Sequence, residues 1–126
     1  MSAKTIAIIG ASANRKKFGN KAVRAYVDAG YTVYPVNPKE TQIEGLPVYH
    51  DVADIPGEVA VASLYLPPRA GEALLPALKA KGIETVFANP GADSPELVAR
   101  GRELGLEVYV ACSIVATGKR PDDYPD

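Results

Sequence analysis

The chain has 126 residues, a formal net charge of −1 and a hydrophobic content of 47%, which predicts one globular domain over residues 1–126 and excludes a disordered chain. A general nucleic-acid-binding protein usually carries a basic excess, which this chain lacks. The single cysteine, Cys112, excludes an internal disulfide and favours a reducing compartment. The first apolar run ends at Gly10, too early for a signal peptide or a membrane span. We therefore expect a cytoplasmic protein that binds neither nucleic acid nor membranes.

Apolar runs and amphipathic segments alternate along the chain, and turn residues separate them. The third amphipathic segment has a clear helix start, because Ser94 is a good N-cap and Pro95 suits the first helical position. Pro76 falls inside the second helix, where it costs a hydrogen bond. A helical turn is expected at 51–55, and the polar segment 119–126 is expected to fray. In chain order, the expected elements are a strand at 5–9, a helix at 20–29, strands at 32–36 and 59–66, a helix at 69–81, a strand at 85–88, a helix at 95–104 and a strand at 107–110.

This alternation predicts an α/β fold, a single doubly wound Rossmann-like domain with a five-stranded parallel sheet in the order 3-2-1-4-5. The 59–66 run is nearly all apolar, as expected of a strand that is covered on both faces. Ligands of such folds bind beyond the carboxyl ends of the strands, at a switch point that we expect between strands one and four. Four segments are expected to converge there, namely 10–19, 36–39, 66–68 and 88–91.

The loop after the first strand is the strongest candidate for a binding site. It runs from Gly10 to Gly19 and leads into a helix, whose N-terminus favours an anion. Arg15, Lys16 and Lys17 add positive charge, so a phosphorylated ligand is the first hypothesis. The loop has neither the dinucleotide-binding nor the P-loop glycine spacing.

The end of the second strand narrows the choice of ligand. An NAD site carries an acidic residue there to hold the ribose hydroxyls. This chain instead has Asn37, Pro38 and Lys39, and a lysine suits a phosphate on the ribose. The residues therefore argue against NAD and leave NADP or coenzyme A (CoA) as alternatives.

Several short motifs over about residues 4–116 follow one known pattern. They are Ile9-Gly10-Ala11-Ser12, Lys17-x-Gly19, Gly30-Tyr31-x-Val33-x-Pro35-Val36-Asn37-Pro38, Ile43-x-Gly45-x-Pro47-Val48-Tyr49, Tyr65-Leu66-Pro67-Pro68, Asn89-Pro90-Gly91 and Ala111-Cys112-Ser113-Ile114. With these motifs the chain resembles the small stand-alone CoA-binding proteins. Those proteins are single-domain relatives of the CoA-binding domain of the succinyl-CoA synthetase alpha subunit. The run from Gly30 to Pro38 is the most specific of the motifs.

The resemblance implies a separate binding role for each of the converging segments. Residues 10–14 with Lys17 would hold the diphosphate of CoA, and residues 37–39 would lie along the adenosine, with Lys39 near its 3′-phosphate. Residues 66–68 would line one wall of the site, and residues 88–90 would contact the pantetheine arm. The family often has an aromatic residue and a glutamine before the equivalent of Gly91, where this chain has Ala88, Asn89 and Pro90. The resulting candidate residues are Gly10, Ala11, Ser12, Ala13, Asn14, Arg15, Lys17, Asn37, Pro38, Lys39, Leu66, Pro67, Pro68, Ala88, Asn89 and Pro90.

The sequence contains no recognisable catalytic constellation. His50, the only histidine, lies in a connection away from the expected switch point, has no metal-ligand partner at the usual spacing, and is expected to be an ordinary surface residue. Ser12 and Ser113 have no base placed to activate them. The related ligases use a catalytic histidine in a second domain and an ATP-binding partner subunit, which a chain of this length does not hold.

We therefore expect a non-enzymatic module that binds CoA or an acyl-CoA as a carrier, sensor or regulator. The alternative is an NADP-linked oxidoreductase-like nucleotide-binding domain. The acyl group, the protein partner and the oligomeric state stay open. Cys112 follows the fifth strand at the edge where the ligand should lie. We hypothesise that its thiol forms a mixed disulfide with CoA under oxidation; the simpler interpretation is a small buried hydrophobic residue.

Overall fold

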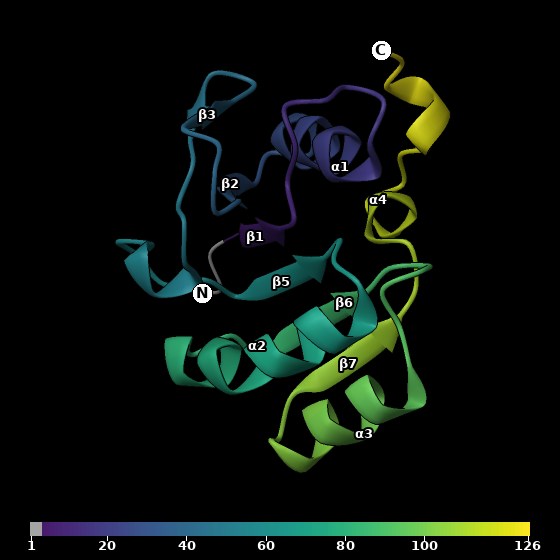
Figure 1. Ribbon diagram of the computed structural model, residues 1–126. Helices are drawn as coiled ribbons and strands as arrows, with labels where there is room; N and C mark the ends of the chain where they lie inside the picture. The colour runs from purple at the N-terminus through teal and green to yellow at the C-terminus, as the bar shows by residue number, and fades with distance from the viewer. Residues whose placement is uncertain (1–3) are drawn as a thin grey trace.

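A computed structural model describes residues 4–126, and its centre is a parallel sheet (Figure 1). All four neighbouring strand pairs run parallel, in the order β2-β1-β5-β6-β7. The predicted α/β doubly wound class and the five predicted strands are confirmed. The strands are β1 (Thr5–Ile9), β2 (Thr32–Val36), β5 (Val61–Leu64), β6 (Thr85–Ala88) and β7 (Glu107–Val110).

The position of the third of these strands corrects one expectation. Counted along the chain, the observed order is 2-1-3-4-5 rather than 3-2-1-4-5, because β5 lies between β1 and β6. The outer side of β2 is occupied by the chain that follows it, since Tyr49 N–H donates to Pro35 O and Asn37 N–H donates to Tyr49 O, both at 3.0 Å. A central place also suits the apolar sequence of β5. The switch point therefore lies between β1 and β5.

Helices cover the sheet on both faces. Figure 1 shows α1 and α4 on one side, and α2 and α3 on the other. The sheet has a hydrophobic core on each face, and alternate residues of β1 point into the two cores. Ile6 and Ile8 pack with α1, while Ala7 and Ile9 pack with α2 and α3. The helices are α1 (Phe18–Asp28), α2 (Pro68–Lys81), α3 (Pro95–Glu103) and the short α4 (Ser113–Ala116).

The helix ends agree with the local sequence signals. Ser94 Oγ accepts the N–H of Leu97 at 3.0 Å and caps α3, as predicted. Gly82 closes α2 with a φ of 90°, a conformation that glycine adopts without strain. Pro76 lies inside α2 and is exposed.

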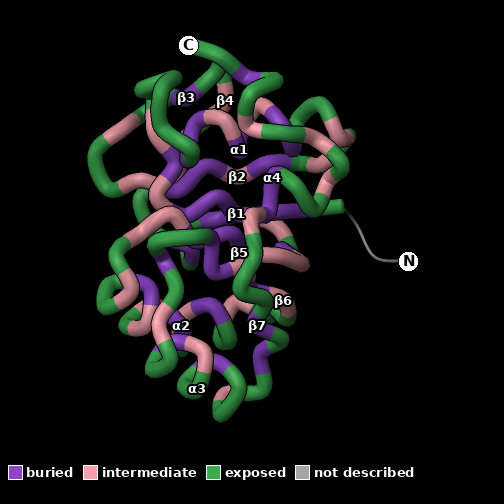
Figure 2. Tube along the Cα trace, turned by 90° about the vertical axis from the view of Figure 1, so that its right-hand side faces the viewer, coloured by how far each residue is buried: buried purple, intermediate pink, exposed green. Residues whose placement is uncertain are grey.

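Several short elements were not expected from the periodicity. They are the hairpin of β3 (Gln42–Ile43) and β4 (Leu46–Pro47), helix α4, and the 3₁₀ turn η2 (Pro121–Asp123); the turn expected at 51–55 is η1 (Val52–Asp54). The segment 119–126, for which fraying was expected, contacts α1, and its Tyr124 is 8% exposed. Figure 2 shows a buried stretch close to the C-terminus. The helices within residues 4–126 include none that is long and apolar enough to cross a membrane.

Candidate functional site

A cleft of about 610 Å³ lies at the carboxyl ends of β1 and β5, the two neighbouring strands that flank the switch point. Each of the four predicted segments contributes to it, so their convergence is confirmed. Its walls are Gly10, Ala11, Ser12, Lys17, Phe18, Gly19, Asn37, Leu64, Tyr65, Leu66, Pro67, Pro68, Pro90, Gly91 and Ala92.

Two glycines let the first loop fold tightly over the end of β1. Gly10 has a φ of +90°, and a Cβ there would lie 2.3 Å from the carbonyl oxygen of Tyr65. A Cβ on Gly19 would lie 2.5 Å from the carbonyl oxygen of Gly10. The amides of Gly10 and Ala11 both donate to Val36 O, at 3.1 and 3.2 Å, which ties the loop to β2. The start of α1 is therefore packed directly against the floor of the cleft.

The N-terminus of α1 is open toward the cleft. Within residues 4–126, no side chain caps this end, and its first turn holds no acidic residue. By contrast, α3 has both Ser94 as a cap and Glu96 in its first turn. Phe18 and Gly19, the first residues of α1, line the cleft. The unpaired N–H groups of a helix start and its positive dipole end bind anions well.

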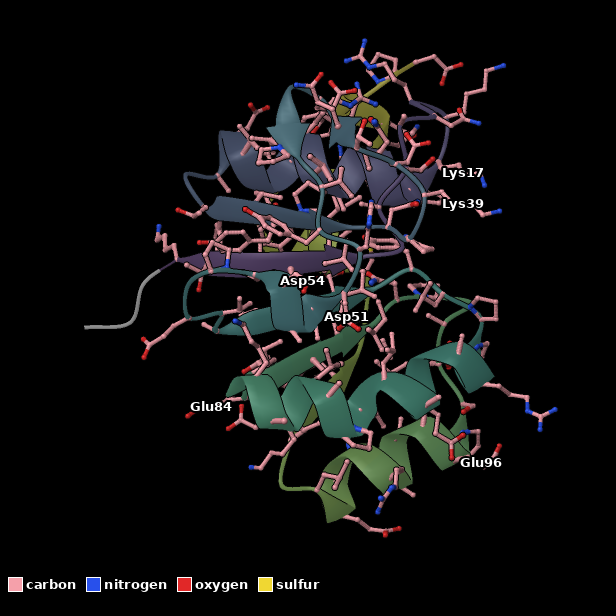
Figure 3. All side chains as sticks on the ribbon, turned by 60° about the vertical axis from the view of Figure 1, so that its left-hand side comes forward. Lys17, Lys39, Asp51, Asp54, Glu84 and Glu96 are labelled. Carbon is pink, nitrogen blue, oxygen red and sulfur yellow. The ribbon has the colours of Figure 1, made fainter. Side chains whose placement is uncertain are left out.

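The three cations of the first loop have different surroundings. Arg15 Nε lies 3.4 Å from Glu44 Oε2, and Lys16 Nζ lies 3.9 Å from Asp126 Oδ2. Lys17 is the one of the three that lines the cleft. Figure 3 shows Lys17 and Lys39 extending from the same edge of the molecule. Lys17 is thus the cation placed to meet a ligand at the α1 N-terminus.

Asn37 organises the junction between the two loops. Its Nδ2 donates to Ala11 O at 2.8 Å, and its Oδ1 accepts the N–H groups of Lys39 at 2.8 Å and Glu40 at 3.0 Å. Asn37 lines the cleft, whereas Pro38 lines a second, mostly apolar cavity of about 230 Å³ beside it. The two cavities share Gly10 and Leu66, and the second is completed by Ile9, Val36, His50, Asp51, Val52 and Leu74.

Comparison with known proteins identifies the family. The sequence model of the CoA-binding domain matches residues 4–118. This chain belongs to the CoA-binding domain family. The CoA-binding domain is 37% identical over 114 residues to subunit alpha of the ADP-forming acetate–CoA ligase II of Pyrococcus furiosus, an alignment that covers 82% of this chain and 25% of the relative. Subunit alpha of ligase I from the same organism is 31% identical over 121 residues, or 83% and 26% of the two chains. The chain thus spans about a quarter of these relatives.

Solved structures agree with this assignment. A hypothetical protein from Pyrococcus horikoshii superposes on the CoA-binding domain with a TM-score of 0.81 and 31% identity, covering 86% of this chain and 76% of the other. The apo form of the dinucleotide-forming acetyl-coenzyme A synthetase 1 of Ca. Korarchaeum cryptofilum gives a TM-score of 0.75 and 26% identity, covering 86% and 26%. The fold is therefore found both in small proteins and in a part of a much larger enzyme.

In the CoA-binding domain, the Asn89 side chain points into the protein core, whereas it was expected to contact the pantetheine arm of the ligand. Asn89 is 2% exposed, and its Nδ2 donates to Ser63 Oγ and Leu64 O, both at 2.8 Å. Its Oδ1 accepts the N–H of Ser113 at 2.8 Å. Ala88 is fully buried, so Pro90 is the only member of this predicted triplet among the cleft-lining residues. Asn89 therefore ties the start of α4 to the sheet, and Ala88 packs in the core with Leu75 and Leu97. The contacts of Ala88 and Asn89 with a ligand stay predictions.

Other predicted residues lie at the rim or outside it. Ala13, Asn14 and Arg15 are exposed and are not among the cleft-lining residues. Lys39 is also exposed and is not among the cleft-lining residues, but it extends from the same edge of the molecule as Lys17 (Figure 3). His50, expected to lie away from the switch point, borders the second cavity, with Nε2 3.2 Å from Glu40 O. None of the described residues forms a His, Cys, Asp and Glu cluster fit for a metal ion.

Six cleft residues were missing from the sequence prediction. They are Phe18, Gly19, Leu64, Tyr65, Gly91 and Ala92, and all lie within the predicted segments or at most two residues from them. Tyr65 had the clearest signal, since it begins the Tyr65-Leu66-Pro67-Pro68 motif. Its hydroxyl lies 3.2 Å from Ser113 Oγ, and burial raises the pKa of this tyrosine. Tyr65 therefore stays neutral at physiological pH.

Cys112 immediately precedes α4 and is half-buried. It packs beside the core that includes Tyr26 and Ile114, with Tyr65 in the same cluster. It is not among the residues that line the cleft. The mixed disulfide between Cys112 and CoA stays a prediction.

Proposed function

We propose that this CoA-binding domain holds CoA or an acyl-CoA across the two adjoining cavities and acts as a carrier, sensor or regulatory module without catalysing a reaction. The observation that carries the proposal is the open N-terminus of α1 beside Lys17, at the switch point of the sheet. CoA carries its negative charges at its nucleotide end, and a helix N-terminus beside a lysine attracts such charges.

The residues of the two cavities suit the three parts of CoA. Because Gly10 and Gly19 lack a Cβ, the first loop packs closely on the start of α1, and Phe18 and Gly19 at this helix start line the cleft where a diphosphate would lie. The apolar second cavity, bordered by Pro38 and Leu66, suits the flat face of an adenine. The apolar wall formed by Leu66, Pro67, Pro68 and Pro90 suits the uncharged pantetheine arm.

A non-catalytic role agrees with the surroundings of the serines. Ser12 Oγ accepts the N–H of Asn14 at 3.0 Å and thereby shapes the loop. Ser113 is fully buried, with Ser63 Oγ at 2.7 Å from its own hydroxyl. Among residues 4–126, neither serine has a base positioned as in a catalytic triad. The ligase activity of the relatives belongs to chains about four times as long, and we do not propose it for this domain.

The ligand itself is the decisive test against the alternative, an NADP-linked oxidoreductase-like domain. Mass spectrometry of the small molecule released by denaturation, together with titration calorimetry, should show one CoA per chain. NADPH should bind more weakly by at least about tenfold, because the loop lacks the dinucleotide glycine spacing. Release of a nicotinamide dinucleotide, or tighter binding of NADPH than of CoA, would favour the alternative.

Lys39 supplies a second, more local prediction. We expect Lys39→Ala to weaken CoA binding by about 5- to 100-fold, the loss of one charge-assisted contact, and dephospho-CoA binding much less. Only CoA carries the ribose 3′-phosphate. Calorimetric titration of both ligands against wild type and variant measures the difference. An equal loss for both ligands would show that Lys39 does not meet that phosphate.

A further inference from the structure

The segment 119–126, called the strap below, is joined to the ligand loop (residues 10–17) by one arginine of α1. Arg24 Nη1 donates to Pro125 O at 2.7 Å, and its Nη2 donates to Tyr124 O at 3.1 Å. The same Nη2 donates to Arg15 O, also at 3.1 Å. One guanidinium therefore holds the backbone of the strap and the backbone of the ligand loop together.

The buried side-chain amide of Asn20 links Arg24 to a second point of the ligand loop, Ser12. Asn20 is fully buried, and its Oδ1 accepts the Nε–H of Arg24 at 2.8 Å. Its Nδ2 donates to Ser12 O at 2.9 Å and to Glu44 Oε2 at 3.0 Å. Asn20 and Arg24 thus fix the ligand loop at Ser12 and at Arg15, without lining the cleft themselves.

The β3–β4 hairpin supports the same cluster at a conformational cost. Glu44 adopts a φ of 50°, which is uncommon for a residue with a Cβ. Its carboxylate accepts from Asn20 and lies 3.4 Å from Arg15 Nε. Interactions with α1 and the ligand loop therefore hold this glutamate in a position where glycine or asparagine would be easier.

The strap has its own anchor on α1. Tyr124 is 8% exposed, its hydroxyl donates to Asp28 Oδ2 at 3.0 Å, and its ring lies 5.7 Å from the Arg24 guanidinium. Burial and the Asp28 carboxylate raise the pKa of Tyr124 to about 12, so the phenol keeps the proton that it donates. The family match ends at residue 118, so the strap lies outside the region that the family model describes.

We infer that the strap is a positioning element for the CoA site. By holding Arg24, it fixes the ligand loop in the shape that presents its backbone and Lys17 to a phosphate. Docking of the strap and binding of CoA then stabilise each other, and thermodynamic linkage requires this effect to be equal in both directions. The inference rests on the proposed function for its ligand, but the coupling of strap and loop is a property of the free protein.

The first arm of the test uses the protein without ligand. A chain that ends after Gly118 and the variant Tyr124→Ala should both show amide hydrogen exchange in residues 12–17 at least about tenfold faster than wild type. Tyr109→Ala is the matched control, since Tyr109 is 49% exposed on β7 and should leave that exchange unchanged. If the shortened chain does not fold, the Tyr124→Ala variant decides this arm.

The second arm measures the coupling with CoA. In wild type, saturating CoA should slow amide exchange in the strap, and loss of the strap should raise the Kd for CoA by about 5- to 30-fold, within the usual range of coupling between two sites. Arg24→Met should still bind CoA at high concentration, but CoA should no longer protect the strap. If Arg24 had only a general structural role, its replacement would not abolish the protection of the strap while CoA still saturates the site. Arg24→Lys should restore only part of that protection.

Two results would overturn the inference. One is loop exchange that is unchanged after removal of the strap, and the other is strap protection by CoA that survives in Arg24→Met. If wild type itself does not bind CoA, the proposed function fails, and the exchange of residues 12–17 in the free protein still decides whether the strap positions the loop.

Discussion

Replacing Gly19 with alanine is expected to weaken CoA binding by about 10- to 100-fold, comparable to the loss of one charge-assisted hydrogen bond. The new Cβ would lie 2.5 Å from the carbonyl oxygen of Gly10, so either the start of α1 or the ligand loop must move. Alanine is a better helix former than glycine by about 1 kcal/mol, so the loss does not come from helix propensity. Titration calorimetry of CoA, with the folded fraction checked by circular dichroism, measures the effect.

Gly101→Ala is the matched control for this change. Gly101 also lies inside a helix, α3, and a Cβ there would also lie 2.5 Å from a neighbour, the Cγ2 of Val108. We expect this overpacking to lower the free energy of unfolding by about 1–3 kcal/mol, with the CoA affinity of the folded protein unchanged. If Gly19→Ala binds CoA as tightly as wild type, or if both variants lose affinity equally, the close approach at Gly19 is not part of the site.

Lys17→Glu is expected to lower CoA affinity by about 10- to 100-fold, since it removes a cation and places a carboxylate beside the diphosphate. Lys17 is the loop cation that lines the cleft. The affinity of wild type should fall as salt is added, because the interaction is between partly exposed charges, and this dependence should shrink in the variant. Calorimetric titrations of CoA at low and high salt measure both effects.

Lys16→Glu provides the comparison at the neighbouring position. The Lys16 side chain is 78% exposed and its nearest acidic partner is Asp126, at 3.9 Å, so the change should alter CoA affinity only a few-fold. Equal losses in the two variants would point to general electrostatics around the loop rather than a contact made by Lys17. An unchanged affinity in Lys17→Glu would show that the phosphates lie elsewhere.

Much of the fold follows from local patterns in the sequence. The five strands, the three long helices and the Ser94 cap depend on apolar periodicity and on residues with special backbone preferences, which act over a few neighbours. The order of the strands depends on contacts between distant segments. The apolar run of β5 indicated a strand covered on both faces, but this strand was expected at the edge of the sheet, because the occupation of the outer side of β2 by Tyr49 was not visible in any local pattern.

The location of the site was likewise predictable, whereas the orientation of its side chains was not. The sequence by itself determined that Gly10, Lys17, Asn37 and Pro67 would meet, because the carboxyl ends of parallel strands share one edge of a sheet. Only the tertiary structure decided which groups face the ligand. Glu44 and Asp126 lie beside Arg15 and Lys16, and Ser63 and Ser113 draw Asn89 into the core. These partners are distant in sequence, and a polar side chain turns toward whichever partner the folded chain brings within hydrogen-bonding distance.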